Sequence, residues 1–217
     1  LIEETNTALH IAYSEIQIAG RLNDLRSTLL LAVDKCPYCG ILPADELDHY
    51  LPQSIYKAVS VYSRNLIPIC HKCNNAKRIA VALAGNNSFF HAYFDVFPRL
   101  PVLIADVDFT DNILVINYKV DRTNTTNDLG NKLDFQFTRT KLNQRLIKES
   151  NSHIFDNKAA IELMYESNNE DGVKKLFVKQ YEEYKIKFGV NFWKTSLMLA
   201  LSNCDHFCKG GFKNYFE

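Results

Sequence analysis

Four cysteines in two pairs are the residues of this chain whose spacing most clearly indicates chemistry. Cys36 and Cys39 lie in CPYCG, Cys70 and Cys73 lie in NLIPICHKCNNAK, and thirty residues separate the two pairs. A closed structural zinc site takes four ligands in a tetrahedral arrangement, and two such pairs supply four thiolates. A redox pair of the thioredoxin type would leave the second pair unexplained. We therefore expect one structural zinc ion, which joins two segments and performs no reaction itself.

Residues that could hydrolyse a substrate lie between and just after the cysteine pairs. Asp48 and His49 are adjacent, fifteen residues separate His49 from Asn65, and Asn74 directly follows Cys73. An imidazole titrates near neutral pH and suits a general base. A carboxylate and an amide oxygen are hard ligands that suit Mg²⁺ or Mn²⁺. A base and a divalent cation together meet the needs of phosphodiester hydrolysis.

The stretch 36–78 resembles the HNH nucleases, also called ββα-metal nucleases, with Asn74 where the last histidine of the motif usually stands. The resemblance implies that His49 takes a proton from water, while Asp48 and Asn74 hold Mg²⁺ or Mn²⁺ to stabilise the leaving 3′ oxygen. It also implies that Asn65 fixes the loop around His49 through backbone hydrogen bonds. Neighbours on a regular strand point to opposite faces, so Asp48 and His49 can share one site only if the strand bends or the site lies at its edge.

Basic residues concentrate near this motif although the whole chain is neutral. Lys and Arg number 25, as do Asp and Glu, so the overall composition gives no support to nucleic-acid binding. Residues 61–80 nevertheless contain four cations and no acid, namely Arg64, Lys72, Lys77 and Arg78. A helix that begins at the second cysteine pair would place Lys77 on the same side as Asn74. We expect this basic patch to contact a phosphate backbone.

A zinc module that binds nucleic acid or a protein without catalysis is the rival hypothesis. Asp48, His49 and Asn74 in register argue against it, because a bare zinc scaffold would not need all three. Asp45 and Glu46 could assist a metal, but we interpret them as part of a polar turn.

A second group of metal-type residues lies near the C-terminus. Cys204, His206 and Cys208 form C-x-H-x-C without an obvious fourth ligand. We interpret them as packing residues, and a second metal site is the alternative.

An α+β fold, mostly helical, must position the candidate residues. The ββα core would be fastened by zinc and surrounded by a helical body with a small β-hairpin. Hydrophobic periodicity and turn residues predict the elements. These are a helix over 3–33 weakened at Gly20, extended segments at ELDHYLP and NLIPIC, a helix from 71 to Gly85, an irregular stretch over 86–108, strands at 113–120 and 133–138, and helices over about 139–203 with a break at 168–172.

The expected organisation is an N-terminal helical segment (1–33), the nuclease core (34–85) and a C-terminal region (86–217) that packs on the core as one compact domain. No stretch has the apolar length that crosses a bilayer, and no signal peptide is visible, so we expect a cytoplasmic protein without a membrane partner. No DNA-reading domain is recognised, so specificity would come from a partner. The family resemblance suggests an ATPase partner in a bacterial anti-phage system of the Septu or retron type, with DNA favoured over RNA as substrate.

Overall fold

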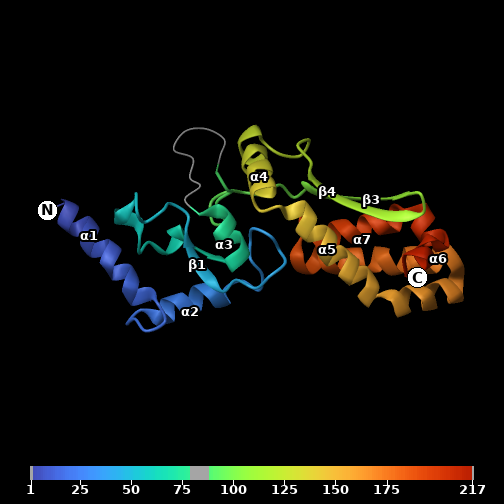
Figure 1. The fold of residues 1–217 in the computed structure, drawn as a ribbon, viewed down its shortest axis with the longest axis horizontal. Coiled ribbons are helices and arrows are strands. Elements are labelled where there is room, and N and C mark those ends of the chain that lie inside the picture. The colour runs from blue at the N-terminus through green and yellow to red at the C-terminus, as the bar shows by residue number, and fades with distance from the viewer. Residues whose placement is uncertain (1, 79–87, 217) are drawn as a thin grey trace. The chain divides into compact units, whose positions relative to one another are not determined.

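The computed structural model describes residues 2–78 and 88–216, and the chain divides into two compact units (Figure 1). The first unit comprises residues 1–96 and 131–140, and the second comprises residues 97–130 and 141–217. Helices and two small antiparallel sheets form an α+β fold that is mostly helical, as the sequence predicts. The packing of residues 86–217 on the core stays a prediction.

The first unit contains the cysteine pairs and the candidate catalytic residues. Its two strands are antiparallel, and His49 pairs with Leu66 at the end of the ladder. Its elements are α1 (Ile2–Ala12), a 3₁₀ turn (Tyr13–Ile16), α2 (Asn23–Leu31), β1 (Glu46–His49), 3₁₀ turns at Lys57–Val59 and Ser63–Asn65, β2 (Leu66–Ile69), α3 (His71–Lys77) and most of α4 (Asn127–Arg139).

The single helix expected over 3–33 is wrong, because the chain turns between α1 and α2. A Cβ atom on Gly20 would collide with the backbone of Glu15, so this close approach requires glycine. The turn allows Ile16 to pack with Leu47 of β1 and Leu66 of β2, with leucines of α2 beside them. The N-terminal segment therefore supports the sheet that carries the candidate site.

Helix α3 is also shorter than expected. It ends at Lys77, because the next residue, Arg78, has φ 48° and ψ −129°, outside the helical region. The predicted end at Gly85 lies in 79–87, outside the described residues.

Residues 133–138 form part of helix α4 and not the predicted strand. The buried side chains of this helix are Leu129, Leu133 and Gln136, followed by Thr140 just after its end, and they are spaced by three or four residues. This spacing is the helical period, whereas the apolar alternation in LDFQFT favours a strand. Packing of the helical face overrides the local pattern.

The second unit contains the predicted hairpin, with an unexpected partner strand. The strand predicted at 113–120 is confirmed as β4 (Ile113–Val120), and it pairs with β3 (Leu103–Thr110), most of which was expected to be irregular. The connecting residues Asp111 and Asn112 have φ values of 49° and 64°. Such values suit a tight two-residue hairpin turn, and Asp and Asn tolerate them.

Helices form most of the rest of the second unit; those within 139–203 confirm the prediction, and the short helix after them was not predicted. The helices are α5 (Leu142–Asp156), α6 (Lys158–Phe188), α7 (Trp193–Asn203) and α8 (Phe212–Phe216), and β3 packs against α7 (Figure 1). The expected break is confirmed as a kink in α6, where Asn168 and Asn169 leave the helical region. Within the described part of the chain, no helix combines the length and apolar character needed to cross a membrane.

Candidate active site

Two tight backbone turns bring the cysteine pairs together. In the first, the amides of Cys39 and Gly40 donate to the Cys36 carbonyl oxygen at 3.3 and 2.8 Å, and Gly40 has φ 64°. In the second, Cys70 precedes the first turn of α3, and its carbonyl oxygen accepts from the Cys73 amide at 3.0 Å. Each pair thus directs two thiols to one point.

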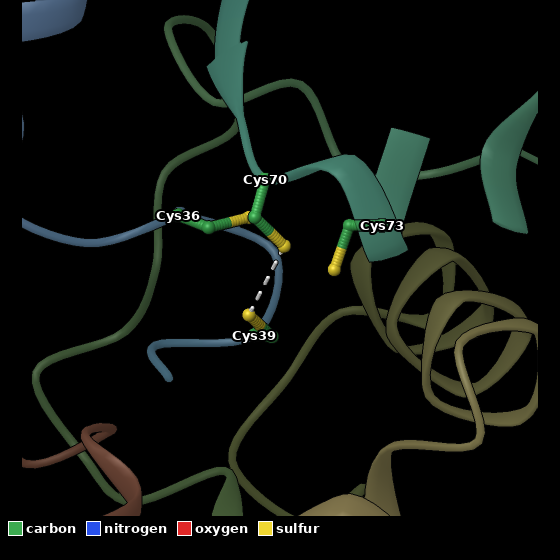
Figure 2. Close-up of side chains that lie close together, drawn as sticks. All are labelled: Cys36, Cys39, Cys70 and Cys73. Atoms are coloured by element: carbon green, nitrogen blue, oxygen red, sulfur yellow. Dashed lines mark hydrogen bonds between the residues drawn. The ribbon is translucent and has the colours of Figure 1, made fainter. Parts of the chain in front are cut away.

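The four sulfur atoms fit a tetrahedral metal site. All four side chains are buried and their Sγ atoms lie within 4.8 Å of one another (Figure 2). Zinc–sulfur bonds of about 2.3 Å at the tetrahedral angle place sulfurs about 3.8 Å apart, and Cys39 Sγ lies 3.9 Å from Cys70 Sγ. Hydrogen bonds among the four thiols lower the pKa of Cys39 and Cys70 and raise the pKa of Cys36 and Cys73, so the geometry and not the titration indicates the metal. The cluster therefore supports structural zinc.

The C-x-H-x-C residues of the second unit form no comparable site. Among residues 2–78 and 88–216, the four-cysteine cluster is the only group of three or more potential metal ligands. Cys204 and Cys208 are buried, and the His206 ring stacks on Phe109 with centroids 4.2 Å apart. These contacts agree with packing roles.

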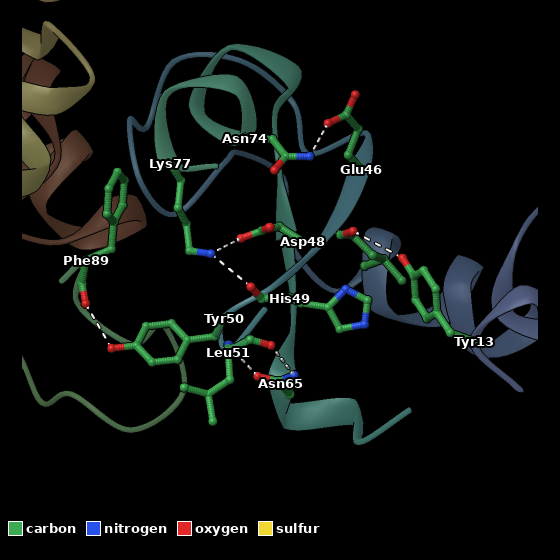
Figure 3. A network of polar contacts seen from close by, with 11 residues as sticks. Tyr13, Glu46, Asp48, His49, Tyr50, Leu51, Asn65, Asn74, Lys77 and Phe89 are labelled. Carbon is green, nitrogen blue, oxygen red and sulfur yellow. Dashed lines mark hydrogen bonds and ion pairs between the residues drawn. The ribbon is translucent and has the colours of Figure 1, made fainter. Parts of the chain in front are cut away.

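Asp48 faces α3 and forms a buried ion pair with Lys77 (Figure 3). Lys77 Nζ lies 2.7 Å from Asp48 Oδ2 and donates to the His49 carbonyl oxygen at 2.9 Å. Burial raises the pKa of Asp48 above its usual range, and Lys77 opposes that rise. Only 1% of Lys77 is exposed, so its ammonium group stabilises Asp48 and is not at the surface, where we expected a phosphate contact.

His49 projects from the other side of β1, toward Tyr13 and Ser60. Its Nε2 atom lies 2.8 Å from the Ser60 carbonyl oxygen. Because a carbonyl can only accept, Nε2 carries the proton and Nδ1 keeps the lone pair of the neutral ring. Burial lowers the pKa of His49, which favours this neutral form. The strand is regular here, so Asp48 and His49 do not converge in this structure.

Tyr13 covers the imidazole of His49. The two ring centroids are 4.3 Å apart with the rings inclined by 62°, and His49 is 8% exposed. The Tyr13 hydroxyl donates to the Leu47 carbonyl oxygen at 3.4 Å. The 3₁₀ turn that follows α1 thus covers the candidate base.

Asn65 continues the β1–β2 ladder with its side chain. Its Oδ1 atom accepts from the Leu51 amide at 2.8 Å, and its Nδ2 atom donates to the carbonyl oxygens of Leu51 and Val59, both at 3.1 Å. The buried amide therefore closes the base of the loop between Leu51 and Asn65, which is the kind of contact implied by the family resemblance.

Asn74 lies on the side of α3 that faces β1, where Glu46 binds it. Asn74 Nδ2 donates to Glu46 Oε2 at 2.7 Å (Figure 3), and Glu46 Oε1 lies 2.7 Å from His71 Nδ1. Although partial burial acts to raise it, these two hydrogen bonds lower the pKa of Glu46 overall. Asn74 and Lys77 thus share the expected helix side, and both contact carboxylates of β1.

The remaining predicted basic residues are exposed. Arg64, Lys72 and Arg78 are at the surface, and the Arg64 guanidinium lies 5.7 Å from the centre of the Phe94 ring. The basic patch therefore keeps three of its four members.

Sequence reasoning missed two residues next to the site. Glu46 was interpreted as part of a polar turn, yet it stands two residues before Asp48, and this spacing places both on one face of a strand. Nothing in the sequence singles out Tyr13 as a neighbour of His49. Its 3₁₀ turn reaches the sheet only because the chain reverses at Gly20.

Comparison with known families identifies the stretch that contains the site. Residues 36–78 match the family model of the HNH endonucleases, so the chain contains an HNH endonuclease domain. The match includes all four cysteines together with Asp48, His49, Asn65 and Asn74.

A curated relative comes from a bacteriophage. Protein ea31 of Escherichia phage lambda is 36% identical over 69 residues, which are 31% of this chain. The matched stretch spans only 23% of the length of that protein. No solved structure matches the chain.

The cysteine cluster predicts a defined zinc content. Metal analysis should find about one zinc per chain, since one tetrahedral site takes one ion. Cys70→Ser should lower this content and the melting temperature, because the site holds two segments together. Cys204→Ser changes a buried cysteine outside the cluster and should retain the zinc. A zinc-free wild-type chain with an unchanged melting temperature would contradict the assignment.

The buried ion pair predicts a pH-dependent loss of stability. Lys77→Met should cost about 3–5 kcal/mol at neutral pH, because it leaves the Asp48 carboxylate buried and unpaired. Removal of the ammonium group raises the pKa of Asp48 further, so the cost should shrink as falling pH protonates the carboxyl. Denaturant titrations at neutral and acid pH measure this difference.

Lys72→Met is the matched control, because Lys72 is exposed on the same helix. Its stability should stay close to that of the wild type. Equal effects of the two substitutions would show that the ion pair contributes nothing specific.

Proposed function

We propose that this chain is a metal-dependent endonuclease that hydrolyses phosphodiester bonds in nucleic acid, with DNA favoured over RNA. The observation that carries the proposal is the antiparallel β1–β2 sheet with α3 against it, beside the four-cysteine cluster, within the stretch matched to the HNH endonucleases. This arrangement places Asp48 and Asn74 on the side of β1 that faces α3 and His49 on the other side, so a scissile phosphate would have to reach both at the strand edge. A zinc module without catalysis would need neither the ionisable side chains nor their defined hydrogen bonds.

Asp48 and Asn74 would hold Mg²⁺ or Mn²⁺. Both supply hard oxygen atoms, and the Asn74 amide uses its nitrogen on Glu46, so that Oδ1 is turned toward the Asp48 side (Figure 3). When bound, the cation supplies charge stabilisation for the leaving oxygen. Lys77 keeps Asp48 ionised in its buried setting, and the carboxylate thereby remains a ligand.

His49 would act as the general base through Nδ1. The Ser60 carbonyl oxygen holds the proton on Nε2, so the opposite nitrogen is the one that can accept a proton from water. Asn65 fixes the strand end that follows His49. The imidazole is thus prepared in one tautomer before substrate binds.

Tyr13 and the segment around it lie beside the imidazole of His49. Ser60 Oγ donates to the Leu9 carbonyl oxygen at 2.8 Å, Lys57 pairs with Glu3 at 2.8 Å, and Ile16 of the 3₁₀ turn is buried against Leu47 and Leu66. Glu3 is 76% exposed, and such surface ion pairs contribute about 0–1 kcal/mol. The ion pair contributes little, but the buried Ile16 anchors the turn, so a nucleic-acid strand would approach His49 with Tyr13 in place.

The exposed cations would contact phosphates. Arg64, Lys72 and Arg78 lie at the surface near the domain, whereas Lys77 does not. Phosphate contacts provide affinity without reading sequence, so they leave target choice to another element or protein.

The biological role that we propose is an effector of a bacterial anti-phage system, acting with an ATPase. The support is the resemblance to compact bacterial HNH proteins.

If His49 is the general base, its replacement should reduce cleavage and leave the fold intact. His49→Ala should lower the rate of DNA cleavage in Mg²⁺ or Mn²⁺ by about 10²- to 10⁴-fold, which is the usual contribution of a general base. Cleavage of plasmid DNA and of RNA, with zinc content measured in parallel, tests this. His206→Ala, an exposed histidine of the second unit, should cleave normally. A near-normal rate in His49→Ala would assign the base elsewhere, and an inactive wild type would favour the non-catalytic zinc module.

The anti-phage role predicts protection that depends on the same residue. Bacteria that express the wild-type chain with its candidate ATPase should support phage plating less well than bacteria with His49→Ala, because protection would require cleavage. Plating efficiency on the two strains measures this. Equal plating would contradict the anti-phage role and leave the nuclease assignment standing.

A further inference from the structure

We propose that Glu46 is a positioning residue that orients the Asn74 amide for metal binding, an inference that rests on the proposed nuclease function. An asparagine side chain has two ends, and only its oxygen can bind a cation. Without a restraint, the amide can present either end to the site. Glu46 removes this ambiguity, because an ionised carboxylate can only accept a hydrogen bond.

The contacts of Glu46 give the amide one orientation. Glu46 Oε2 accepts from Asn74 Nδ2 at 2.7 Å, which leaves Asn74 Oδ1 for the side that carries Asp48 (Figure 3). Glu46 and Asp48 are two residues apart on β1, so they share a strand face. The distance is short, as expected for a hydrogen bond to a charged acceptor.

A second contact holds Glu46 itself in place. Its other oxygen, Oε1, lies 2.7 Å from Nδ1 of His71, and the backbone amide of His71 donates to Asp45 Oδ1 at 3.2 Å. His71 is the first residue of α3, and Asn74 stands one turn later. One carboxylate thus links the start of β1 to two positions on α3, and it fixes the helix side that Asn74 presents.

Two other roles for Glu46 make opposite predictions. If Glu46 were a metal ligand, or if it attracted the cation through its charge alone, removal of its charge would weaken metal binding in every background. If Glu46 orients Asn74, the effect depends on what occupies position 74. Asn74→Asp loses the donor and places a second carboxylate against Glu46, so the two groups repel.

An exchange of the two side-chain types tests the proposal. In Asn74→Asp combined with Glu46→Gln, the new amide at 46 donates to the new carboxylate at 74, whose other oxygen faces the site. We expect Asn74→Asp alone to weaken Mn²⁺ binding and the double variant to recover about tenfold or more, within the 10- to 100-fold range for residues that orient metal ligands. Mn²⁺ titration followed by electron paramagnetic resonance, on the zinc-loaded chain without nucleic acid, provides the measurement. Weaker binding by the double variant than by Asn74→Asp would overturn the proposal.

Glu46→Leu and Asp24→Asn complete the comparison. Glu46→Leu removes the acceptor and should weaken Mn²⁺ binding by about 10- to 100-fold. Because the hydrogen bond is lost, the side-chain NH₂ protons of Asn74 should also exchange with solvent faster than in the wild type, as measured by nuclear magnetic resonance. Asp24→Asn removes an exposed charge on α2, outside this network, and it should change neither readout.

The two readouts separate failure of this proposal from failure of the proposed function. A wild-type chain that binds no Mn²⁺ would overturn the metal-dependent nuclease assignment and this proposal with it. Normal Mn²⁺ binding by wild type and by Glu46→Leu alike would overturn the positioning role and leave the nuclease assignment intact.

Discussion

The requirement that four sulfur atoms meet within 4.8 Å is the constraint on which the first unit depends. The elements that it joins are short: β1 and β2 have four residues each, and α3 has seven. A helix of that length and an isolated two-stranded sheet are marginal in water. Fastening residues 36–39 to residues 70–73 brings β1 and β2 together and fixes the start of α3. The positions of the candidate catalytic residues then follow from the cysteines.

The sequence predicted the parts of the site that depend on short-range spacing. Two cysteine pairs, each with two residues between its members, are sufficient to indicate the cysteine cluster. The cluster places Asn74 on a helix that starts at Cys70, and alternation along ELDH sends Asp48 and His49 to opposite faces. Both relations are properties of a single element, so they survive any packing of that element. Alternation along the strand also places Glu46 on the same face as Asp48, a relation that we did not use.

The features that the sequence did not predict depend on contacts between distant segments. Lys77 resembles a surface cation until Asp48 is placed opposite it, and its burial follows from that pair. In α4, Gln136 donates to the Tyr38 carbonyl oxygen inside the first cysteine pair at 2.9 Å, a contact that favours the helix over the apparent strand of LDFQFT. The turn at Asp111 and Asn112 was a local signal and could have identified the hairpin.

The side chain of Asn65 replaces a peptide group at the end of the sheet. It accepts from and donates to the backbone of Leu51, as a neighbouring strand residue would. Aspartate lacks the donor, and glutamine is longer by one methylene, so neither reproduces the pair. The same amide also donates to the Val59 carbonyl oxygen, and the next carbonyl, that of Ser60, bonds His49. One asparagine therefore couples the end of the ladder to the backbone that sets the tautomer of the imidazole.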